Sequence, residues 1–368
     1  MKAKSIFKTM SPYKPGKQVD EVKREFNLDR IVKLASNENP FGYSKKVDAV
    51  VRETANHFEI YPDGYATELR QLLSEDLKVD PDQLVFGCGA DEVIDIICRT
   101  YLSEGTNTIV PDPTFPQYKH NALIQGATVK EIPLVDGYHD LDAMLVAVDS
   151  QTRIIWLCSP NNPTGSLIDQ QTLEKFLADC PSDVLVVVDE AYMDYVESGN
   201  KVNTIDLLHN NPNLIIVRTF SKVYGLAGLR IGYGIAQLEV SEALNIARGP
   251  FNTTRLAQQA AIVAYQDKDF IENTVSETIK NRQTFMNALD QMNLSYYDSE
   301  ANFVFVKLPV SGDSLFNYLM TEGFIVRSGE ALGHPNGVRI TIGNADDMQI
   351  LRDKIQLFLD QQVGELNQ

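Results

Sequence analysis

The apolar run Val184–Val188, reading VLVVV, constrains the fold of this chain more than any other short stretch. Five consecutive apolar residues, most of them β-branched, are typical of a strand that is buried on both faces. Such a strand belongs inside a sheet that carries helices on both sides. The run ends at Asp189, so a carboxylate stands at the carboxyl end of the expected strand. The stretch therefore predicts a domain of the α/β class.

Other apolar runs alternate with amphipathic stretches from about residue 66 onward, which implies a mostly parallel sheet with right-handed crossovers. Ligands of such sheets bind at the carboxyl ends of the strands. The turns 87–91, 159–165, 189–192 and 219–222 all follow expected strands, so we expect them to line one site. The further strands are expected at Leu84–Phe86, Thr108–Val110, Thr128–Ile132, Arg153–Leu157 and Leu214–Val217, and the helices at Thr67–Leu77, Glu92–Tyr101, Phe115–Asn121 and Leu173–Ala178.

The pattern changes after about residue 250, where a smaller α+β domain is expected. A chain of 368 residues is longer than a single hydrophobic core usually serves. We expect an N-terminal arm over residues 1–36 that packs with the small domain, a large domain over 37–248 and a small C-terminal domain over 249–368. The small domain is expected to hold helices at Leu256–Tyr265, Asp269–Leu289, Gly312–Glu322 and Ala345–Leu359, and strands at Ser295–Tyr297, Phe303–Lys307, Phe324–Arg327 and Gly337–Thr341.

The composition limits the partners of the chain. Its formal net charge of −17 argues against nucleic acid or an anionic membrane surface as the main partner. The start of the sequence has no apolar core of the length of a signal peptide, and no apolar run approaches the length that spans a bilayer. The four cysteines show no metal-ligand spacing, so no metal site is expected. These features predict a cytoplasmic protein.

A lysine with an unusual setting follows the expected strand Leu214–Val217. Lys222 precedes the largely apolar run Val223–Leu229, so it is either a solvated loop residue or a lysine in a partly apolar site. Burial lowers the pKa of a lysine, and a neutral amine can attack a carbonyl to form a Schiff base. Donors suited to a phosphate lie close by in the sequence, namely Thr219, Ser221 and Arg230. A ligand that carries both a carbonyl and a phosphate suggests pyridoxal phosphate.

The rest of the chain offers the other groups that pyridoxal phosphate needs. Asp189 could keep the ring nitrogen protonated, although Asp after a strand is also a common helix N-cap. Tyr192 and Asn162 could bond the phenolic oxygen of the ring, although Asn162 also suits an ordinary turn. The glycine-rich turn 87–91 opens a helix that offers backbone N–H groups to a phosphate, and Phe115 could stack on the ring.

Nine motifs of the sequence resemble those of the fold-type-I pyridoxal-phosphate aminotransferases and, within them, the histidinol-phosphate aminotransferases. The motifs span about residues 33–343, which is nearly the whole chain. SPNNPTG together with the SK-x-x-G-x-x-G-x-R pattern is highly specific for the superfamily. The motifs are KLASNENPFG, YPDG, GCGADEVI, PDPTF, SPNNPTG, VVDEAY, RTFSKVYGLAGLRIGYG, ANFVF and VRITIG.

The resemblance implies roles for the residues that match the cofactor motifs. Lys222 is implied to be the Schiff-base lysine, and Asp189 the partner of the pyridine nitrogen. Asn162 and Tyr192 are implied to contact the phenolic oxygen. The residues implied to hold the cofactor phosphate are Ala90, Asp91, Thr219, Ser221 and Arg230.

The resemblance also implies a dimer and a substrate site. Tyr61 matches a tyrosine that reaches the phosphate from the other subunit, which implies a homodimer with shared active sites. Arg339 matches the arginine that binds the anionic group of the substrate, and Arg327 and Tyr13 are implied to lie near it. Tyr13 stands between two prolines, so it belongs either to an arm on the surface or to an arm that closes over the site. Phe115 stands where the family often has tyrosine, so only stacking is expected there.

The implied activity is the transfer of an amino group between L-histidinol phosphate and 2-oxoglutarate, in histidine biosynthesis, with Lys222 as general base and acid. The products would be imidazole acetol phosphate and L-glutamate. An aromatic amino acid aminotransferase shares all the cofactor residues and stays an alternative. A pyridoxal-phosphate-dependent decarboxylase of a phosphorylated amino acid is a second alternative. A regulator that binds the cofactor without catalysis is a third, and the lack of a DNA-binding pattern counts against it.

Overall fold

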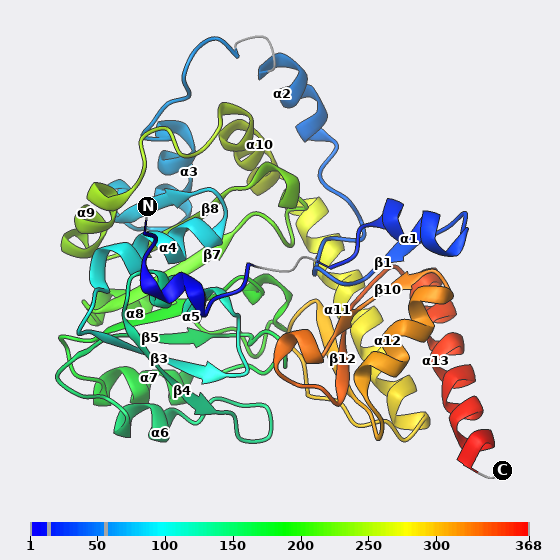
Figure 1. Cartoon of the computed structure of the whole chain (residues 1–368). Coiled ribbons are helices and arrows are strands. Elements are labelled where there is room, and N and C mark those ends of the chain that lie inside the picture. The colour runs from blue at the N-terminus through cyan, green and yellow to red at the C-terminus, as the bar shows by residue number, and fades with distance from the viewer. Residues whose placement is uncertain (1, 13–15, 55–57, 367–368) are drawn as a thin grey trace.

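The computed structural model of the protein describes residues 2–12, 16–54 and 58–366, the last four of these as backbone only. A larger body holds a central sheet, and a smaller body, at the right of Figure 1, is bordered by the C-terminal helix α13 (Ala345–Leu366). The long helix α11 (Lys268–Gln291) leads from the larger body into the smaller one. The sequence alternation therefore leads to the expected α/β architecture with an additional α+β unit.

The central sheet has seven strands in the order β2-β8-β7-β6-β5-β3-β4. Five neighbouring strands, from β7 to β4, are parallel, and β8 runs antiparallel to both of its neighbours. The mostly parallel sheet predicted from the sequence is thus confirmed. Its strands are β2 (Leu84–Gly87), β3 (Asn107–Asp112), β4 (Thr128–Pro133), β5 (Thr152–Cys158), β6 (Leu185–Asp189), β7 (Leu214–Thr219) and β8 (Gly232–Ala236).

Strand β6 is buried on both faces, as its apolar run predicts. Val186 and Val188 point into one hydrophobic cluster, while Leu185 and Val187 point into the other. Helices contribute side chains to each cluster, so the sheet is the middle of three layers. The first cluster takes side chains from α3 (Thr67–Leu77), α6 (Leu141–Val146), α7 (Gln170–Asp179), α8 (Thr204–Asn210) and α10 (Arg255–Gln266). The second takes them from α4 (Ala90–Tyr101), α5 (Gln117–Ile124) and α9 (Leu238–Ala247).

The smaller body is built on an antiparallel sheet in the order β11-β12-β9. A third hydrophobic cluster joins this sheet to α11, α12 and α13. A separate parallel pair, β1 with β10, ties the segment before residue 37 to the smaller body. These elements are β1 (Val32–Lys33), β9 (Phe303–Lys307), α12 (Gly312–Thr321), β10 (Phe324–Ile325), β11 (Arg327–Ser328) and β12 (Gly337–Thr341).

Two strand predictions for the smaller body are wrong. Residues 295–297 form only an isolated bridge between Tyr296 and Val306, along the edge of β9 that does not pair with β12. The expected single strand Phe324–Arg327 is divided at Val326, because β10 pairs with β1 while β11 pairs with β12.

Strand β8 and several short helices are not predicted from the sequence. β8 contains Gly232 and Gly234, and glycine weakens a strand pattern. The structure explains Gly232, because a Cβ there would lie 2.5 Å from the backbone nitrogen of Ala90. The glycine lets the start of α4 approach the sheet. The unpredicted helices are α1 (Val19–Phe26), α2 (Lys46–Thr54), α6, α8 and α9.

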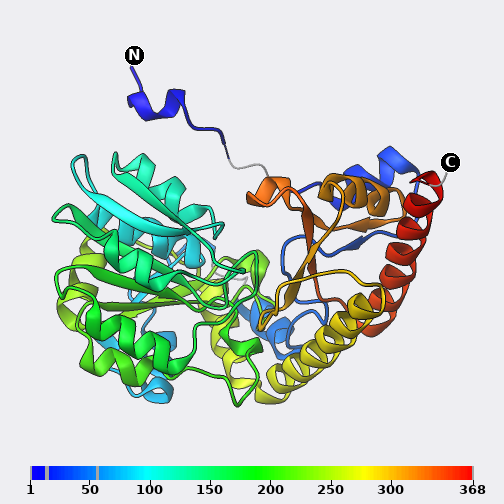
Figure 2. The same cartoon turned by 90° about the horizontal axis from the view of Figure 1, so that it is seen from below.

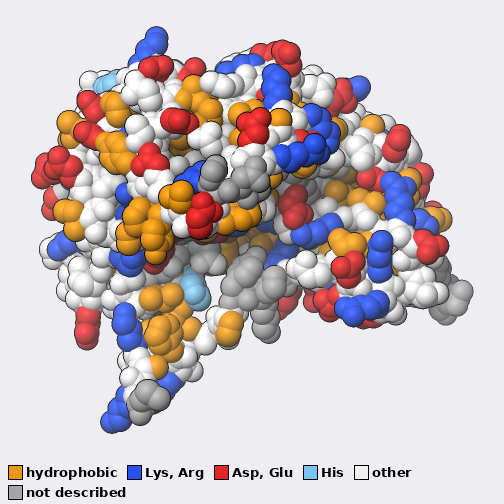
Figure 3. All heavy atoms as spheres, turned by 90° about the horizontal axis from the view of Figure 1, so that it is seen from above, with side chains coloured by type: hydrophobic (Ala, Val, Ile, Leu, Met, Phe, Trp, Pro, Cys, Tyr) orange, Lys and Arg blue, Asp and Glu red, His pale blue; other side chains and the backbone are white. Residues whose placement is uncertain are grey.

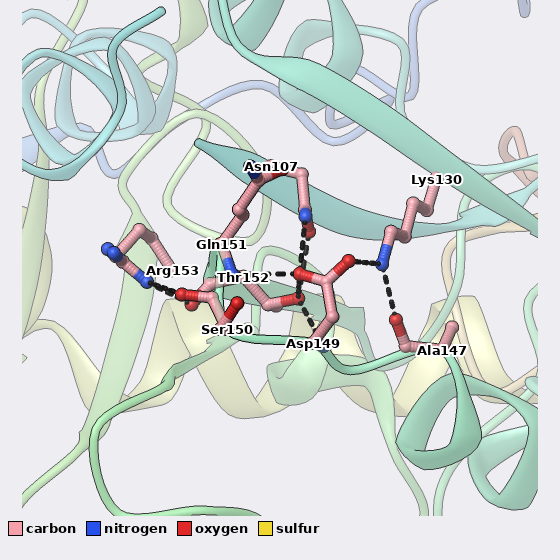
Figure 4. A network of polar contacts seen from close by, with 8 residues as sticks. All are labelled: Asn107, Lys130, Ala147, Asp149, Ser150, Gln151, Thr152 and Arg153. Atoms are coloured by element: carbon pink, nitrogen blue, oxygen red, sulfur yellow. Dashed lines mark hydrogen bonds and ion pairs between the residues drawn. The ribbon is translucent and has the colours of Figure 1, made fainter. Parts of the chain in front are cut away.

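The amino ends of the parallel strands are joined by a network around Asp149 (Figure 4). The Asp149 carboxylate accepts hydrogen bonds from the Asn107 side chain at 2.8 Å and from the Lys130 ammonium at 2.7 Å. The backbone N–H of Asp149 donates to the Thr152 hydroxyl at 2.9 Å. Because these residues belong to β3, β4 and β5, the network fixes the strands at the end opposite to the turns expected to line the site.

The start of the chain stands away from the cleft between the bodies. A short 3₁₀ helix, Ser5–Lys8, contacts α5, and the Lys4 ammonium donates a hydrogen bond to the Ile124 carbonyl at 2.9 Å. Figure 2 shows this segment as a projection, and Figure 3 shows hydrophobic and charged side chains interspersed over the face seen from above. Within the described ranges, no helix combines the length and apolar character needed to cross a membrane.

Candidate active site

A cavity of about 560 Å³ lies at the carboxyl ends of β5, β6 and β7, where the larger body meets the smaller one. Residues from all four predicted turns line it, so the expectation that these turns share one site is confirmed. The residues singled out from the sequence that line the cavity are Ala90, Asp91, Phe115, Asn162, Asp189, Tyr192, Thr219, Ser221, Lys222, Arg230, Arg327 and Arg339.

Lys222 lies just beyond the end of β7, in the wall of the cavity. Its ammonium donates a hydrogen bond to the Ser36 carbonyl at 3.2 Å. Burial and the positive charge of Arg339 together lower the pKa of Lys222 to about 8, while Asp91 and Glu38 act in the opposite direction. A substantial fraction of this amine is therefore neutral near physiological pH and can act as a nucleophile or base.

Asp189 ends β6 and is only 3% exposed. Its Oδ2 accepts a hydrogen bond from the Tyr118 hydroxyl at 2.6 Å, and its Oδ1 accepts one from the Ala191 backbone N–H at 3.0 Å. Burial raises the pKa of Asp189 to about 6, although both hydrogen bonds oppose that rise. The short 3₁₀ helix that follows has Tyr192 at its N-cap, so Asp189 does not cap it. The carboxylate is instead presented to the cavity.

Tyr192 and Asn162 present hydrogen-bond donors to the cavity because their acceptors are already used. The Tyr192 hydroxyl accepts a hydrogen bond from the Asn37 side-chain amide at 2.9 Å, so its own proton can point elsewhere. The Asn162 Oδ1 accepts a hydrogen bond from Arg339 at 2.6 Å, which leaves the Asn162 NH₂ group to donate. Both side chains are thus suited to bind an oxygen atom of a ligand.

A group of donors surrounds the start of helix α4. The N-cap Gly89 has a φ of +80°, which favours glycine, and a Cβ there would lie 2.3 Å from Arg230 Nη2 and so displace that guanidinium. Arg230 donates hydrogen bonds to the Ser221 hydroxyl at 3.3 Å and to the Asp91 carboxylate at 3.1 Å. The Thr219 hydroxyl donates to Ser221 at 3.0 Å. A helix N-terminus beside an arginine and two hydroxyls is an anion site by its donors and dipole.

Two arginines from the smaller body face the same cavity. Arg327 on β11 and Arg339 on β12 are register partners in the antiparallel pair, so their side chains lie next to each other. Arg339 is 5% exposed and donates to the Ala35 carbonyl at 2.6 Å, which fixes its position. Their combined positive charge suits an anionic group that carries more negative charge and more acceptor oxygens than one carboxylate.

One predicted site residue does not line this cavity, and the structure does not describe another. Tyr61 is 76% exposed and stacks on Phe251 at 4.7 Å between ring centroids, away from the cavity of its own chain. Tyr13 lies outside the described residues. Phe115 lines the cavity beside Pro116, at the start of α5.

Sequence reasoning missed several residues of the site. Asn37, in the NENPFG turn, has a positive φ of 57° and bonds both Tyr192 and Thr341. From the sequence, Tyr118 is predicted only to lie in a helix. An aromatic residue three positions after Phe115 would share its face of the expected helix, and this spacing is a signal that identifies Tyr118 as a candidate. Glu38 and Cys158 also line the cavity, and no pattern in the sequence distinguishes them.

These residues fit pyridoxal phosphate on the chemistry of their donors. The buried Asp189 carboxylate suits a protonated ring nitrogen, and the donors of Asn162 and Tyr192 suit a phenolic oxygen. The α4 start, shaped by Gly89, suits a phosphate. Lys222, with its lowered pKa, suits a carbonyl carbon.

Comparison with known proteins gives consistent results. A family model described as aminotransferase class I and II matches residues 29–355. A histidinol-phosphate aminotransferase 2 of Oceanobacillus iheyensis is 49% identical over 365 residues, which cover 99% of this chain and 100% of the relative. A histidinol-phosphate aminotransferase of Anoxybacillus flavithermus is 50% identical over 351 residues, which cover 95% of each chain.

A solved structure shares the fold. The crystal structure of a histidinol-phosphate aminotransferase from Sinorhizobium meliloti, in complex with pyridoxal 5'-phosphate, superposes with a TM-score of 0.89 and covers 98% of both chains. Its sequence identity of 24% makes this a statement about the fold alone. The superposition agrees with the predicted fold-type-I class.

Proposed function

This chain belongs to the class I and II aminotransferase family, and we propose that it transfers an amino group between L-histidinol phosphate and 2-oxoglutarate with pyridoxal phosphate as cofactor. The reaction would form imidazole acetol phosphate and L-glutamate, a step of histidine biosynthesis. The observation that carries the proposal is one cavity that joins Lys222 and Asp189 to an anion site at α4 and to two arginines of the smaller body.

The cofactor residues have distinct roles in this proposal. Pyridoxal phosphate, when bound, supplies a protonated ring that withdraws electrons from the amine-bearing carbon of the substrate. Asp189 places a negative charge beside the ring nitrogen, and Asn162 and Tyr192 donate hydrogen bonds to the phenolic oxygen. Ala90, Asp91, Thr219, Ser221 and Arg230 hold the phosphate, and Phe115 stacks on the ring.

Lys222 moves the proton in this proposal. Its Nζ takes the proton from the amine-bearing carbon of the substrate and holds it as an ammonium. It would then deliver the proton to the carbon of the cofactor. A pKa of about 8 suits both directions, because both the amine and the ammonium are then populated near neutral pH. Arg339 orients the substrate so that this carbon faces the Nζ atom.

The substrate assignment rests on the names of the relatives and is supported by the arginine pair. A phosphate ester carries more negative charge than a carboxylate and has three acceptor oxygens, so it is held better by several donors. Arg327 and Arg339 lie opposite each other in the β11–β12 ladder and both line the cavity. Tyr13 is proposed as a third donor to the same group.

An assay with an amine panel tests the assignment. The purified protein, with pyridoxal phosphate and 2-oxoglutarate, is expected to form glutamate with a higher kcat/KM for L-histidinol phosphate than for phenylalanine or tyrosine. A preference for the aromatic amino acids would contradict the proposal in favour of an aromatic aminotransferase. Release of carbon dioxide from a phosphorylated amino acid, without glutamate formation, would favour a decarboxylase.

Substitution of the two arginines should separate their contributions. Loss of a hydrogen bond to a charged group costs about 1.5–3 kcal/mol, so Arg327→Ala should lower kcat/KM for histidinol phosphate about 10- to 100-fold. The loss for phenylalanine should be smaller, since a carboxylate needs one arginine. Arg339→Ala should impair both half-reactions because 2-oxoglutarate also needs that arginine.

The matched control is Arg153→Ala, which removes an arginine of β5 whose guanidinium hydrogen-bonds to the carbonyls of residues 150 and 152. It should leave kcat/KM unchanged for both amines. Equal losses of kcat/KM for histidinol phosphate and phenylalanine in Arg327→Ala would show that Arg327 does not bind the phosphate group of the substrate.

We also propose a homodimer, a two-domain chain and a cytoplasmic location. The dimer is supported by the exposed apolar side chains of Phe58, Ile60 and Tyr61, since such patches mark interaction surfaces. The two-domain organisation is supported by the separate hydrophobic clusters of the two sheets, while α10, which lies beyond residue 248, packs in the cluster of the larger body. The location is supported by the four cysteines, which are all free thiols.

A further inference from the structure

We propose that Tyr118 is a positioning residue that keeps a proton on the ring nitrogen of the bound cofactor instead of on Asp189. The inference rests on the proposed function, because it concerns the contact between Asp189 and pyridoxal phosphate. Tyr118 lies outside the cavity lining and touches neither cofactor nor substrate in this assignment. It acts through the carboxylate.

The hydrogen bond between the two residues is short and fully buried. The Tyr118 hydroxyl donates to Asp189 Oδ2 at 2.6 Å, and Tyr118 is 0% exposed while Asp189 is 3% exposed. Water therefore does not compete for this bond, and in such surroundings a hydrogen bond to a charged oxygen is strong.

The position of the Tyr118 ring is fixed by its neighbours. The ring stacks on Trp156 of β5 with centroids 4.7 Å apart, and it meets the edge of Phe115 at 5.6 Å. Trp156 is in turn anchored, because its indole N–H donates to the Thr108 hydroxyl at 2.9 Å. A side chain held in this way places its hydroxyl at one point, so the Asp189 carboxylate cannot rotate freely.

Tyr118 is a permanent donor. Burial and the nearby carboxylate raise the pKa of its hydroxyl well above the ordinary value, so it stays protonated throughout the working range of pH. A permanent donor stabilises the charged form of its acceptor more than the neutral form. Asp189 needs such help, because its burial favours the neutral acid.

The hydrogen bond from Tyr118 influences which of two bases holds a single proton. The ring nitrogen and the Asp189 carboxylate share one proton, which either lies on nitrogen, with a carboxylate beside it, or lies on oxygen, with a neutral ring beside it. Only the first arrangement makes the ring a strong electron sink. Donation by Tyr118 favours the carboxylate and hence the protonated ring, and its removal should let the proton move to Asp189.

The test uses pyridoxal phosphate labelled with ¹⁵N at the ring nitrogen, bound to the full-length protein. In the wild type we expect the ¹⁵N resonance of a protonated ring at pH 7.5. In Tyr118→Phe, which keeps the aromatic stack, the resonance should move towards that of an unprotonated pyridine, and kcat should fall about 10-fold or more. A ¹⁵N resonance equal to that of the wild type would overturn the proposal.

Two further variants make the result specific. Site-specific 3-fluorotyrosine at position 118 is nearly isosteric and a stronger donor, so it should keep the ring protonated, and a shift towards the neutral ring in this variant would contradict the proposal. Tyr265→Phe removes another buried tyrosine that donates to a carboxylate, that of Asp76, outside the cavity, and should leave the ¹⁵N resonance unchanged. A wild-type protein that binds no pyridoxal phosphate would contradict the proposed function itself, and this inference with it.

Discussion

Lys222 shows how the surroundings of one residue decide its chemistry. A solvated lysine has a pKa near 10.4 and is almost fully protonated at neutral pH. Here burial and the neighbouring Arg339 lower the pKa of Lys222 to about 8. The apolar run that follows Lys222 is a reason to expect this environment from local sequence, whereas the arginine comes from a strand more than one hundred residues later.

The lowered pKa of Lys222 leads to a prediction about pH. Only the neutral amine attacks a carbonyl, so the rate at which the cofactor-free protein reacts with pyridoxal phosphate should rise with pH and reach half of its plateau near pH 8. Stopped-flow absorbance between pH 6 and pH 10 measures this.

Lys222→Ala should lose the visible band of the lysine-linked cofactor and nearly all turnover. Wild-type-like activity in that variant would contradict the role given to Lys222.

Asp189→Asn tests whether the charge of Asp189 matters. Asn keeps an acceptor for the Ala191 N–H through its Oδ1 and can donate from its NH₂ group to the Tyr118 hydroxyl oxygen, so the fold should persist. The lost charge should lower kcat about 10- to 100-fold, the equivalent of about 1.5–3 kcal/mol. If Asp189 only stabilised the following turn, turnover would change little, since Asn serves there as well as Asp.

The same variant has a predicted effect on stability with a definite sign. The folded-state pKa of Asp189 is raised to about 6, above the value of about 3.9 for an unfolded Asp. The folded state therefore binds more protons than the unfolded state between these values, so the carboxylate destabilises the cofactor-free protein above pH 6. Asp189→Asn should raise its melting temperature at pH 8 and have little effect below pH 4. A lower melting temperature at pH 8 would contradict this.

At the scale of elements, the two ends of the central sheet have different tasks. The carboxyl ends of the strands carry the cavity, while the amino ends are joined by the Asp149 network (Figure 4). Hydrogen bonds from Lys130 and Asn107 hold the pKa of Asp149 well below its usual range. The network thus stabilises the sheet without entering the site.

Asp149→Ala should therefore affect stability and leave the chemistry alone. A carboxylate whose folded-state pKa is lowered stabilises the fold above its unfolded pKa, and this contribution is lost as pH falls through the folded value. The melting temperature of Asp149→Ala should be lower than that of the wild type at pH 7, and the difference should shrink at pH values below 4. Asp149→Asn, which keeps an acceptor for Asn107, should lie between the two. KM for the amine should not change, and a changed KM would show that the network reaches the site.

At the scale of the whole molecule, Tyr61 and its neighbours point to an assembly. Tyr61 and Phe58 are about three-quarters exposed, at 76% and 75%, and Phe251, which stacks on Tyr61, is 46% exposed. Large apolar side chains that gather at one place on a surface mark interaction sites. In the proposed homodimer a second copy of the chain covers them, and Tyr61 reaches the phosphate in the partner's site.

Mixing two impaired variants tests this arrangement. Tyr61→Ala should weaken retention of pyridoxal phosphate, and Lys222→Ala should abolish turnover. After subunit exchange, each heterodimer should regain one complete site, with Lys222 from one chain and Tyr61 from the other. Native mass spectrometry checks the exchange, and Lys222→Ala alone is the control. Exchange without recovered activity would show that Tyr61 does not act across the interface.

The sequence alone determined the part of the site that depends on order along the chain. Apolar runs such as that ending at Asp189 identify parallel strands, and the carboxyl ends of parallel strands meet at one edge. The turns with Asn162, Asp189 and Lys222 can therefore be placed together from sequence order, because each lies within a few residues of its strand. The division of the expected strand Phe324–Arg327 and the presence of β8, which contains glycine, cannot be predicted in this way, since both depend on which strands pair.

The tertiary structure decided the contacts between segments that are far apart in the sequence. Asn37 donates to Tyr192 across 155 residues, and Arg339 donates to Asn162 across 177. The hydrogen bond from Tyr118 to Asp189 spans 71 residues. No local pattern predicts such pairs. The sequence of each element reflects only its own burial, whereas the pair forms when the two elements pack together. They fix where protons and donors point in the cavity, and that orientation exists only once the chain has folded.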